Sequence, residues 1–181
     1  MEPYAYNPQK AKALLTAAGY PQGFDAGVFS CDAVYASQIE GVVNDLAASG
    51  IRAKVHPLER AAMLAAVREK TVKNLVRVGN GAPGNAATRI ETSMLSTGTL
   101  SFLKDPEIDQ WFAQQAHARH RPTREALLHK IQQKAYDEAY FLPIWQLGFL
   151  CVTGPRVAVS GLGLIPGHIY SAPYEDVRLK A

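Results

Sequence analysis

The sequence predicts a mixed α/β fold in which helices cover a sheet, and two observations carry that prediction. Predicted strands at residues 24–30 and 51–56 alternate with predicted helices at 33–49 and 58–70. Residues 51–56 also alternate apolar and polar side chains, a period of two that is typical of a strand with one buried face. Because a right-handed crossover through a helix returns the chain to the same sheet, both strands are expected in one sheet.

The first element is a short helix that local chemistry defines at both ends. Asn7 can accept a hydrogen bond from a free amide of the first turn, and Pro8 has a preset φ and no amide to satisfy. Gly19 supplies the left-handed residue that commonly ends a helix. We therefore expect a helix from Pro8 to just before Gly19.

The remaining elements follow from periodicity and from turn residues. In the helix at 33–49, Ala36, Ile39, Val43 and Leu46 recur at helical spacing, and Gly50 ends it. The half-buried pattern of the next strand indicates a place near a sheet edge. Further elements are expected as a strand at 74–78, a helix from Asp105-Pro106 with Trp111 and Phe112 toward the core, a helix from Pro122 to about Tyr140, a strand at 141–152 and a terminal strand at 176–179.

Composition places the chain among ordinary globular domains. It has 181 residues, 48% of them hydrophobic and 19% charged, with a net charge of +3. Lys and Arg are scattered, which argues against a nucleic-acid partner. No apolar run is long enough to span a membrane and no secretory signal is recognisable, so the chain as written is expected to remain cytoplasmic. Cys31 and Cys151 are expected to be buried thiols, with one disulfide between them left open.

Neither a catalytic centre nor a metal site is expected. His117 and His120 are three residues apart on a predicted helix, with His129 beyond them, but the neighbouring arginines favour a solvated face over metal binding. Gly79-x-Gly81-x-x-Gly84 matches the dinucleotide fingerprint weakly, because Pro83 lies inside it and the following residues, 86–90, are not expected to form the required helix. No nucleophile elbow occurs, so the sequence predicts a non-enzymatic protein without a cofactor.

Several segments, in chain order, resemble the family 5 extracellular solute-binding proteins, the dipeptide, oligopeptide and nickel receptors of ABC importers. The matching segments are residues 6–24 with Tyr-Asn-Pro and Ala-Gly-Tyr-Pro, 39–55, 58–63, Lys-Asp-Pro-Glu-Ile-Asp at 104–109, and Phe-Leu-Pro-Ile-Trp at 141–145. The resemblance implies a type II periplasmic-binding-protein fold, with residues 1–160 as most of the C-terminal lobe. It also implies that 161–181 form an irregular tail returning toward an absent N-terminal lobe.

The implied function is capture of a small, peptide-like or other solute between two lobes and its delivery to an ABC permease in the membrane. The parent protein would then be periplasmic or extracellular, with its export signal in the absent part. The alternative is a stand-alone protein interaction module derived from such a lobe. An enzyme is the least favoured class.

The resemblance also suggests candidate ligand contacts. Peptide-binding relatives carry an aspartate for the ligand's ammonium where this chain has Gly79, so a free peptide N-terminus is a poor ligand and Arg89 could instead hold an anionic group. The remaining candidates lie at the end of the first predicted strand, in the glycine-rich loop and on the late apolar segment: Ser30, Tyr35, Asn80, Trp145 and Gln146.

Overall fold

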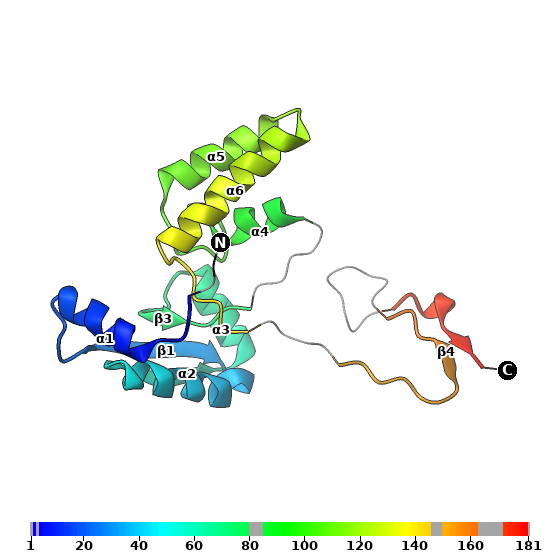
Figure 1. Ribbon diagram of the computed structural model, residues 1–181. Helices are drawn as coiled ribbons and strands as arrows, with labels where there is room; N and C mark the ends of the chain where they lie inside the picture. The colour runs from blue at the N-terminus through cyan, green and yellow to red at the C-terminus, as the bar shows by residue number, and fades with distance from the viewer. Residues whose placement is uncertain (1, 3, 80–84, 146–149, 163–171, 181) are drawn as a thin grey trace. The chain divides into compact units, whose positions relative to one another are not determined.

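The computed structural model describes residues 2, 4–79, 85–145, 150–162 and 172–180. The chain divides into two compact units, Met1–Gly79 and Asn80–Ala181 (Figure 1). The sequence expectation of a lobe at 1–160 followed by a tail at 161–181 stays a prediction. No helix of the described ranges is long and apolar enough to cross a membrane.

The first unit is a three-stranded parallel sheet with helices, as the α/β prediction requires. The sheet order is β2-β1-β3, so β2 is an edge strand among the described residues, as predicted. The elements follow the order α1 (Pro8–Ala17), β1 (Phe24–Asp32), the 3₁₀ helix η1 (Ala33–Tyr35), α2 (Ala36–Ala48), β2 (Ile51–Leu58), α3 (Arg60–Arg68) and β3 (Leu75–Val76).

The predicted first helix is confirmed together with both of its ends. The Asn7 side chain accepts a hydrogen bond of 2.8 Å from the Lys10 amide, and Gly19 has a φ of 92°. The helix expected at 33–49 begins instead as η1, because the Asp32 carboxylate accepts from the Val34 amide at 3.3 Å and holds the first turn in a tighter form.

The core of the first unit joins β1 to α2. Phe29, Cys31 and Ile39 are buried, and Val43 packs against them as the helical spacing predicted. Cys31 carries a free thiol. The expectation of two buried thiols is wrong for Cys151, which is exposed because the segment that carries it packs into no described core.

The second unit contains an antiparallel pair of long helices and a short antiparallel pair of strands. Its elements are α4 (Ala86–Ser93), α5 (Pro106–His117), α6 (Arg121–Asp137), β4 (Val157–Val159), the 3₁₀ helix η2 (Tyr174–Asp176) and β5 (Arg178–Leu179). Ile90, Ile108 and Ile131 form its buried core. Trp111 and Phe112 pack against that core, which confirms the predicted aromatic face of α5.

Asp105 joins the start of α5 to the end of α6. Its carboxylate accepts from the amides of Glu107 and Ile108 at 3.0 and 3.3 Å and from the Tyr140 hydroxyl at 2.8 Å. The Lys134 ammonium lies 3.1 Å away and also pairs with Glu107. These hydrogen bonds keep the pKa of Asp105 below its ordinary value of 3.8, although burial by itself would raise it.

One predicted strand of the second unit is wrong, and one observed strand was not predicted. The described part of 141–152 forms no strand, and Leu142, Leu150 and Val152 are 72%, 92% and 94% exposed. An apolar run becomes a strand only where a neighbouring strand accepts its backbone hydrogen bonds, and none pairs with it in the described ranges. The short β4, which sequence reasoning missed, pairs antiparallel with β5 instead.

The structure also corrects the expectation for the segment after the glycine-rich loop. Residues 86–90 were not expected to be helical, yet they begin α4, because the Asn85 side chain accepts from the Thr88 amide at 3.1 Å and caps the first turn. Most of the glycine-rich segment, residues 80–84, lies outside the described residues.

Candidate ligand-binding site at the carboxyl edge of the sheet

The carboxyl ends of the three parallel strands converge at one edge of the sheet in the first unit. Ser30 on β1 lies opposite His56 on β2 and Val76 on β3. Its side chain is buried, with 3% of the residue exposed. Open α/β sheets present ligand contacts at this edge, so the register places Ser30 at the expected position.

Tyr35 and Arg77 meet at this edge through a cation–π contact. The Arg77 guanidinium carbon lies 3.6 Å from the centroid of the Tyr35 ring. Tyr35 ends η1 directly after β1, and the Arg77 amide donates to the Ser30 carbonyl at 2.9 Å directly after β3. The edge therefore brings together two sequence-predicted residues, Ser30 and Tyr35, with Arg77, which sequence reasoning missed.

A second arginine reaches the same edge from α3. One Nη of Arg60 lies 3.2 Å from the Asp32 carboxylate. The Arg60 side chain is 71% exposed and that of Asp32 is 11% exposed, so the carboxylate is held inside and the guanidinium faces water. Neither residue was predicted, because residues 28 positions apart meet only once the strands have paired.

The Cys31 thiol at this edge is a poor nucleophile. Burial raises the pKa of its thiol, and the nearby Asp32 carboxylate adds to that effect while Arg77 opposes it. A thiol with a raised pKa stays protonated near neutral pH and is a poor nucleophile.

The other predicted contacts belong to the second unit. Arg89 is half-buried on α4, and burial lowers the pKa of its guanidinium. It has no ion-pair or hydrogen-bond partner among the described residues. Trp145 is 38% exposed in an irregular segment. Asn80 and Gln146 lie outside the described residues.

The histidines are not arranged as the sequence suggested. His117 ends α5, whereas His120 is the residue that precedes α6, so they do not share one helix face. No group of three His, Cys, Asp or Glu side chains within the described ranges could hold a metal ion.

Comparison with known proteins finds relatives and solved structures that are similar to this chain. The glutathione-binding protein GsiB of Pectobacterium atrosepticum is 25% identical over 98% of this chain, and the nickel-binding periplasmic protein of Escherichia coli is 24% identical over 98%. The NikA structure from Brucella suis covers 99% of the chain with a TM-score of 0.79 and 22% identity. The chain matches part of a lobe of the family 5 solute-binding proteins.

Further comparisons agree on the fold. The periplasmic binding protein DppA from Helicobacter pylori, solved with the peptide STSA, covers 77% of the chain with a TM-score of 0.62 and 24% identity. The fold is therefore that of type II periplasmic binding proteins. The chain spans 36% and 37% of the lengths of the two curated relatives, and no family model matches it.

Proposed function

We propose that this chain is the ligand-binding lobe of a non-enzymatic substrate-binding protein that serves an ABC importer. The observation that carries the proposal is the match of 98% of the chain to two curated proteins that are each named for a solute they bind. In the proposed mechanism, a solute is enclosed between the carboxyl edge of the sheet and an opposing lobe, and the closed form is recognised by a membrane permease. Residues 161–181 would return toward that opposing lobe.

The proposed place of action is outside the cytoplasmic membrane. Several of the similar proteins are described as periplasmic, among them the nickel-binding protein of Escherichia coli and DppA of Helicobacter pylori. A solute receptor that feeds an importer must meet its ligand on the outer side of the membrane. We therefore infer a periplasmic or extracellular setting for the parent protein.

The ligand we propose is a small organic solute with an anionic group. Arg77 and Arg60 lie at the sheet edge, where Arg77 stacks on the Tyr35 ring and the mostly exposed Arg60 pairs with Asp32. In the first unit, Gly79 offers no carboxylate to a ligand ammonium. In the second unit, the half-buried Arg89 has no ion-pair or hydrogen-bond partner among the described residues. Arginine binds carboxylate and phosphate groups with two parallel hydrogen bonds, so this balance of charge favours an anion.

Backbone NMR of the 181-residue chain tests the proposal directly. Glutathione, a free tetrapeptide, the same peptide with a blocked N-terminus and a dicarboxylate are each added at millimolar concentration. We expect the dicarboxylate, glutathione and the blocked peptide to shift the amide signals of Ser30, Tyr35 and Arg77. Arg77→Gln should weaken this response about tenfold, because a charged hydrogen-bond partner is lost.

Arg68→Gln is the matched control for that experiment. Arg68 is an exposed arginine of α3, and removing its charge should leave the response unchanged. The proposal is wrong if all four solutes leave the sheet edge unperturbed, or if both arginine variants weaken the response equally.

One observation favours the alternative, a stand-alone interaction module. Leu142, Leu150 and Val152 are large apolar side chains that stand more than two-thirds exposed within one stretch of chain. Large apolar side chains that are exposed favour association with another protein surface. Light scattering separates the two functions, since a monomer supports the solute-binding lobe and an obligate oligomer with a large interface supports the module.

A further inference from the structure

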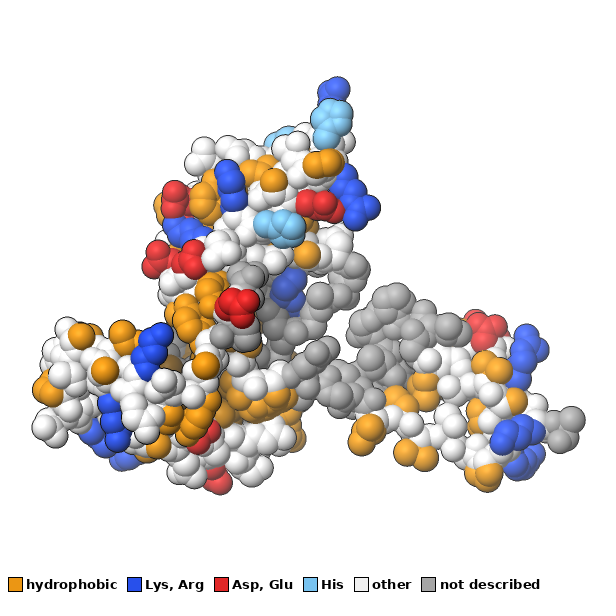
Figure 2. Space-filling view, in the orientation of Figure 1, with side chains coloured by type: hydrophobic (Ala, Val, Ile, Leu, Met, Phe, Trp, Pro, Cys, Tyr) orange, Lys and Arg blue, Asp and Glu red, His pale blue; other side chains and the backbone are white. Residues whose placement is uncertain are grey.

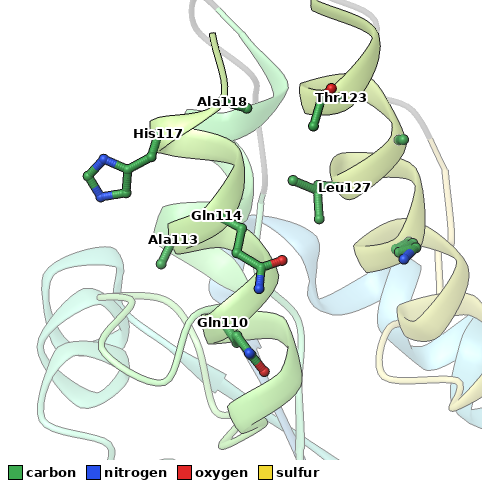
Figure 3. Close-up of a pocket in the computed structure, with 9 residues that line it drawn as sticks. Gln110, Ala113, Gln114, His117, Ala118, Thr123 and Leu127 are labelled. Carbon is green, nitrogen blue, oxygen red and sulfur yellow. The ribbon is translucent and has the colours of Figure 1, made fainter. Parts of the chain in front are cut away.

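A groove of about 690 Å³ runs between α5 and α6 in the second unit. The lining residues lie between positions 110 and 118, on α5 and its C-cap, and between 123 and 130 on α6, so each side extends over roughly 12 Å at 1.5 Å per residue. Figure 3 shows Thr123 and Leu127 pointing from α6 toward α5. The groove is thus elongated along the helix axes, which is the shape that receives another helix.

The floor of the groove is apolar, and it is separate from the core of the unit. Ala113, Ala126 and Leu127 line it, whereas the neighbouring Leu128 packs against the buried Ile131 cluster. Small alanine side chains let a docked backbone approach closely. Leu127 remains half-buried and supplies an apolar contact for an incoming side chain.

Basic residues are concentrated from the end of α5, through the turn between the two helices, into the part of α6 that follows it, and His117 and Lys130 among them line the groove. From His117 to Lys130 the chain has four Lys and Arg residues and one acidic residue, Glu125. Glu125 is already paired with Arg121 at 2.6 Å. Figure 2 shows Lys, Arg and His side chains gathered over this end of the helical pair, so an incoming partner meets positive charge.

We propose that this groove is a docking site for an acidic amphipathic helix of a partner protein. Apolar side chains on one face of that helix would fill the space between α5 and α6. Acidic side chains along its edges would face Arg119, Arg124 and Lys130. Such an arrangement combines the two determinants of helix-in-groove recognition, apolar anchors and complementary charge. The proposal concerns a surface distinct from the carboxyl edge of the sheet and does not depend on solute binding.

The probe is a synthetic helical peptide of about 18 residues with leucines on one face and glutamates on the other, labelled for fluorescence anisotropy. A second peptide has every glutamate replaced by lysine. We expect the acidic peptide to bind the 181-residue chain with a dissociation constant on the order of 10–100 micromolar, and the basic peptide at least about tenfold more weakly.

Two matched substitutions on α5 locate the binding. Ala113→Glu adds bulk and negative charge inside the groove, whereas Ala116→Glu makes the same change on an exposed residue that does not line it. The first should weaken the acidic peptide at least about tenfold, and the second should change it less than about twofold. Circular dichroism of both variants confirms that the helices are retained.

Three results would overturn the proposal. The two peptides could bind equally well or equally poorly, which would remove charge complementarity. The two glutamate variants could have the same effect, which would place binding outside the groove. Sedimentation could instead reveal a dimer of the chain that Ala113→Glu dissociates, which would make a second copy of this chain the occupant.

Discussion

At the scale of single residues, the Asp105 carboxylate connects the start of α5 to the end of α6 and to Tyr140. It caps α5 through two backbone amides, accepts from the Tyr140 hydroxyl and pairs with Lys134. The residue itself is only 6% exposed. Replacing it by alanine removes a cap and leaves buried donors without an acceptor, so Asp105→Ala should lower the free energy of unfolding by about 2 kcal/mol or more.

The same contacts make the stability depend on pH in a defined direction. The pKa of Asp105 is lower in the folded chain than its ordinary value of 3.8, so its contribution is complete above that value and disappears as the pH falls through the folded pKa. Urea unfolding at several pH values measures this. The difference in unfolding free energy between the natural chain and Asp105→Asn should be constant near neutral pH and shrink below about pH 4.

Asp45→Asn is the control, because Asp45 is exposed on α2 and makes no described contact. Its unfolding free energy should follow that of the natural chain at every pH. A difference for Asp105→Asn that stays constant down to pH 2 would contradict the assigned role of the carboxylate.

Single residues also show which local contacts and which site positions could be predicted from the sequence. The caps Asn7 and Asp105 were predictable, because a cap depends on residues within three positions of it. Ser30 and Tyr35 were predicted beside the end of the first strand, and the structure has them there, whereas their role as ligand contacts stays a prediction. Arg77 reaches Tyr35 only because β3 pairs beside β1, and no local pattern in the sequence reports that pairing.

At the scale of elements, β1 and β2 begin so close together that only glycine fits between them. Gly23 has a φ of 67°, and a β-carbon added there would lie 1.8 Å from the Gly50 carbonyl oxygen. The adjacent Phe24 amide donates to the same oxygen at 3.2 Å, so this contact starts the parallel pairing of the two strands. A side chain at Gly23 would force the strand ends apart.

We therefore expect Gly23→Ala to lower the free energy of unfolding by about 3 kcal/mol. Gly41→Ala is the matched control in α2, where the added β-carbon has no neighbour within 4 Å. That change should stabilise the chain by up to about 1 kcal/mol, because alanine is the better helix former. Urea denaturation of both variants measures the difference. Equal effects of the two substitutions would show that the close approach at Gly23 has no energetic consequence.

The elements also differ in how well the sequence predicted them. α1, β1, α2 and β2 were predicted within a few residues, because periodicity and end signals coincide in each. The strand expected at 141–152 was wrong, and the short pair of β4 and β5 was found only in part. Both cases depend on which distant strand is available for pairing, and apolar character alone does not specify a partner.

At the scale of the whole molecule, the chain corresponds to little more than a third of its curated relatives, 36% and 37% of their lengths. Under the proposed function, a solute is bound between two surfaces, and the carboxyl edge of this sheet provides one of them. Contacts on one side of a solute also leave its other side in water. The affinity of the 181-residue chain should then be far below that of a two-lobed receptor.

Isothermal titration calorimetry of the 181-residue chain tests this last expectation. We expect a dissociation constant on the order of 1 mM or weaker for the solutes that perturb the sheet edge, because only part of the binding free energy is available to offset the lost freedom of the ligand. Arg77→Gln should remove even this weak signal, whereas Arg68→Gln should retain it. A micromolar constant would mean that the described surface forms a sufficient pocket by itself, and the opposing lobe would then have no part in holding the solute.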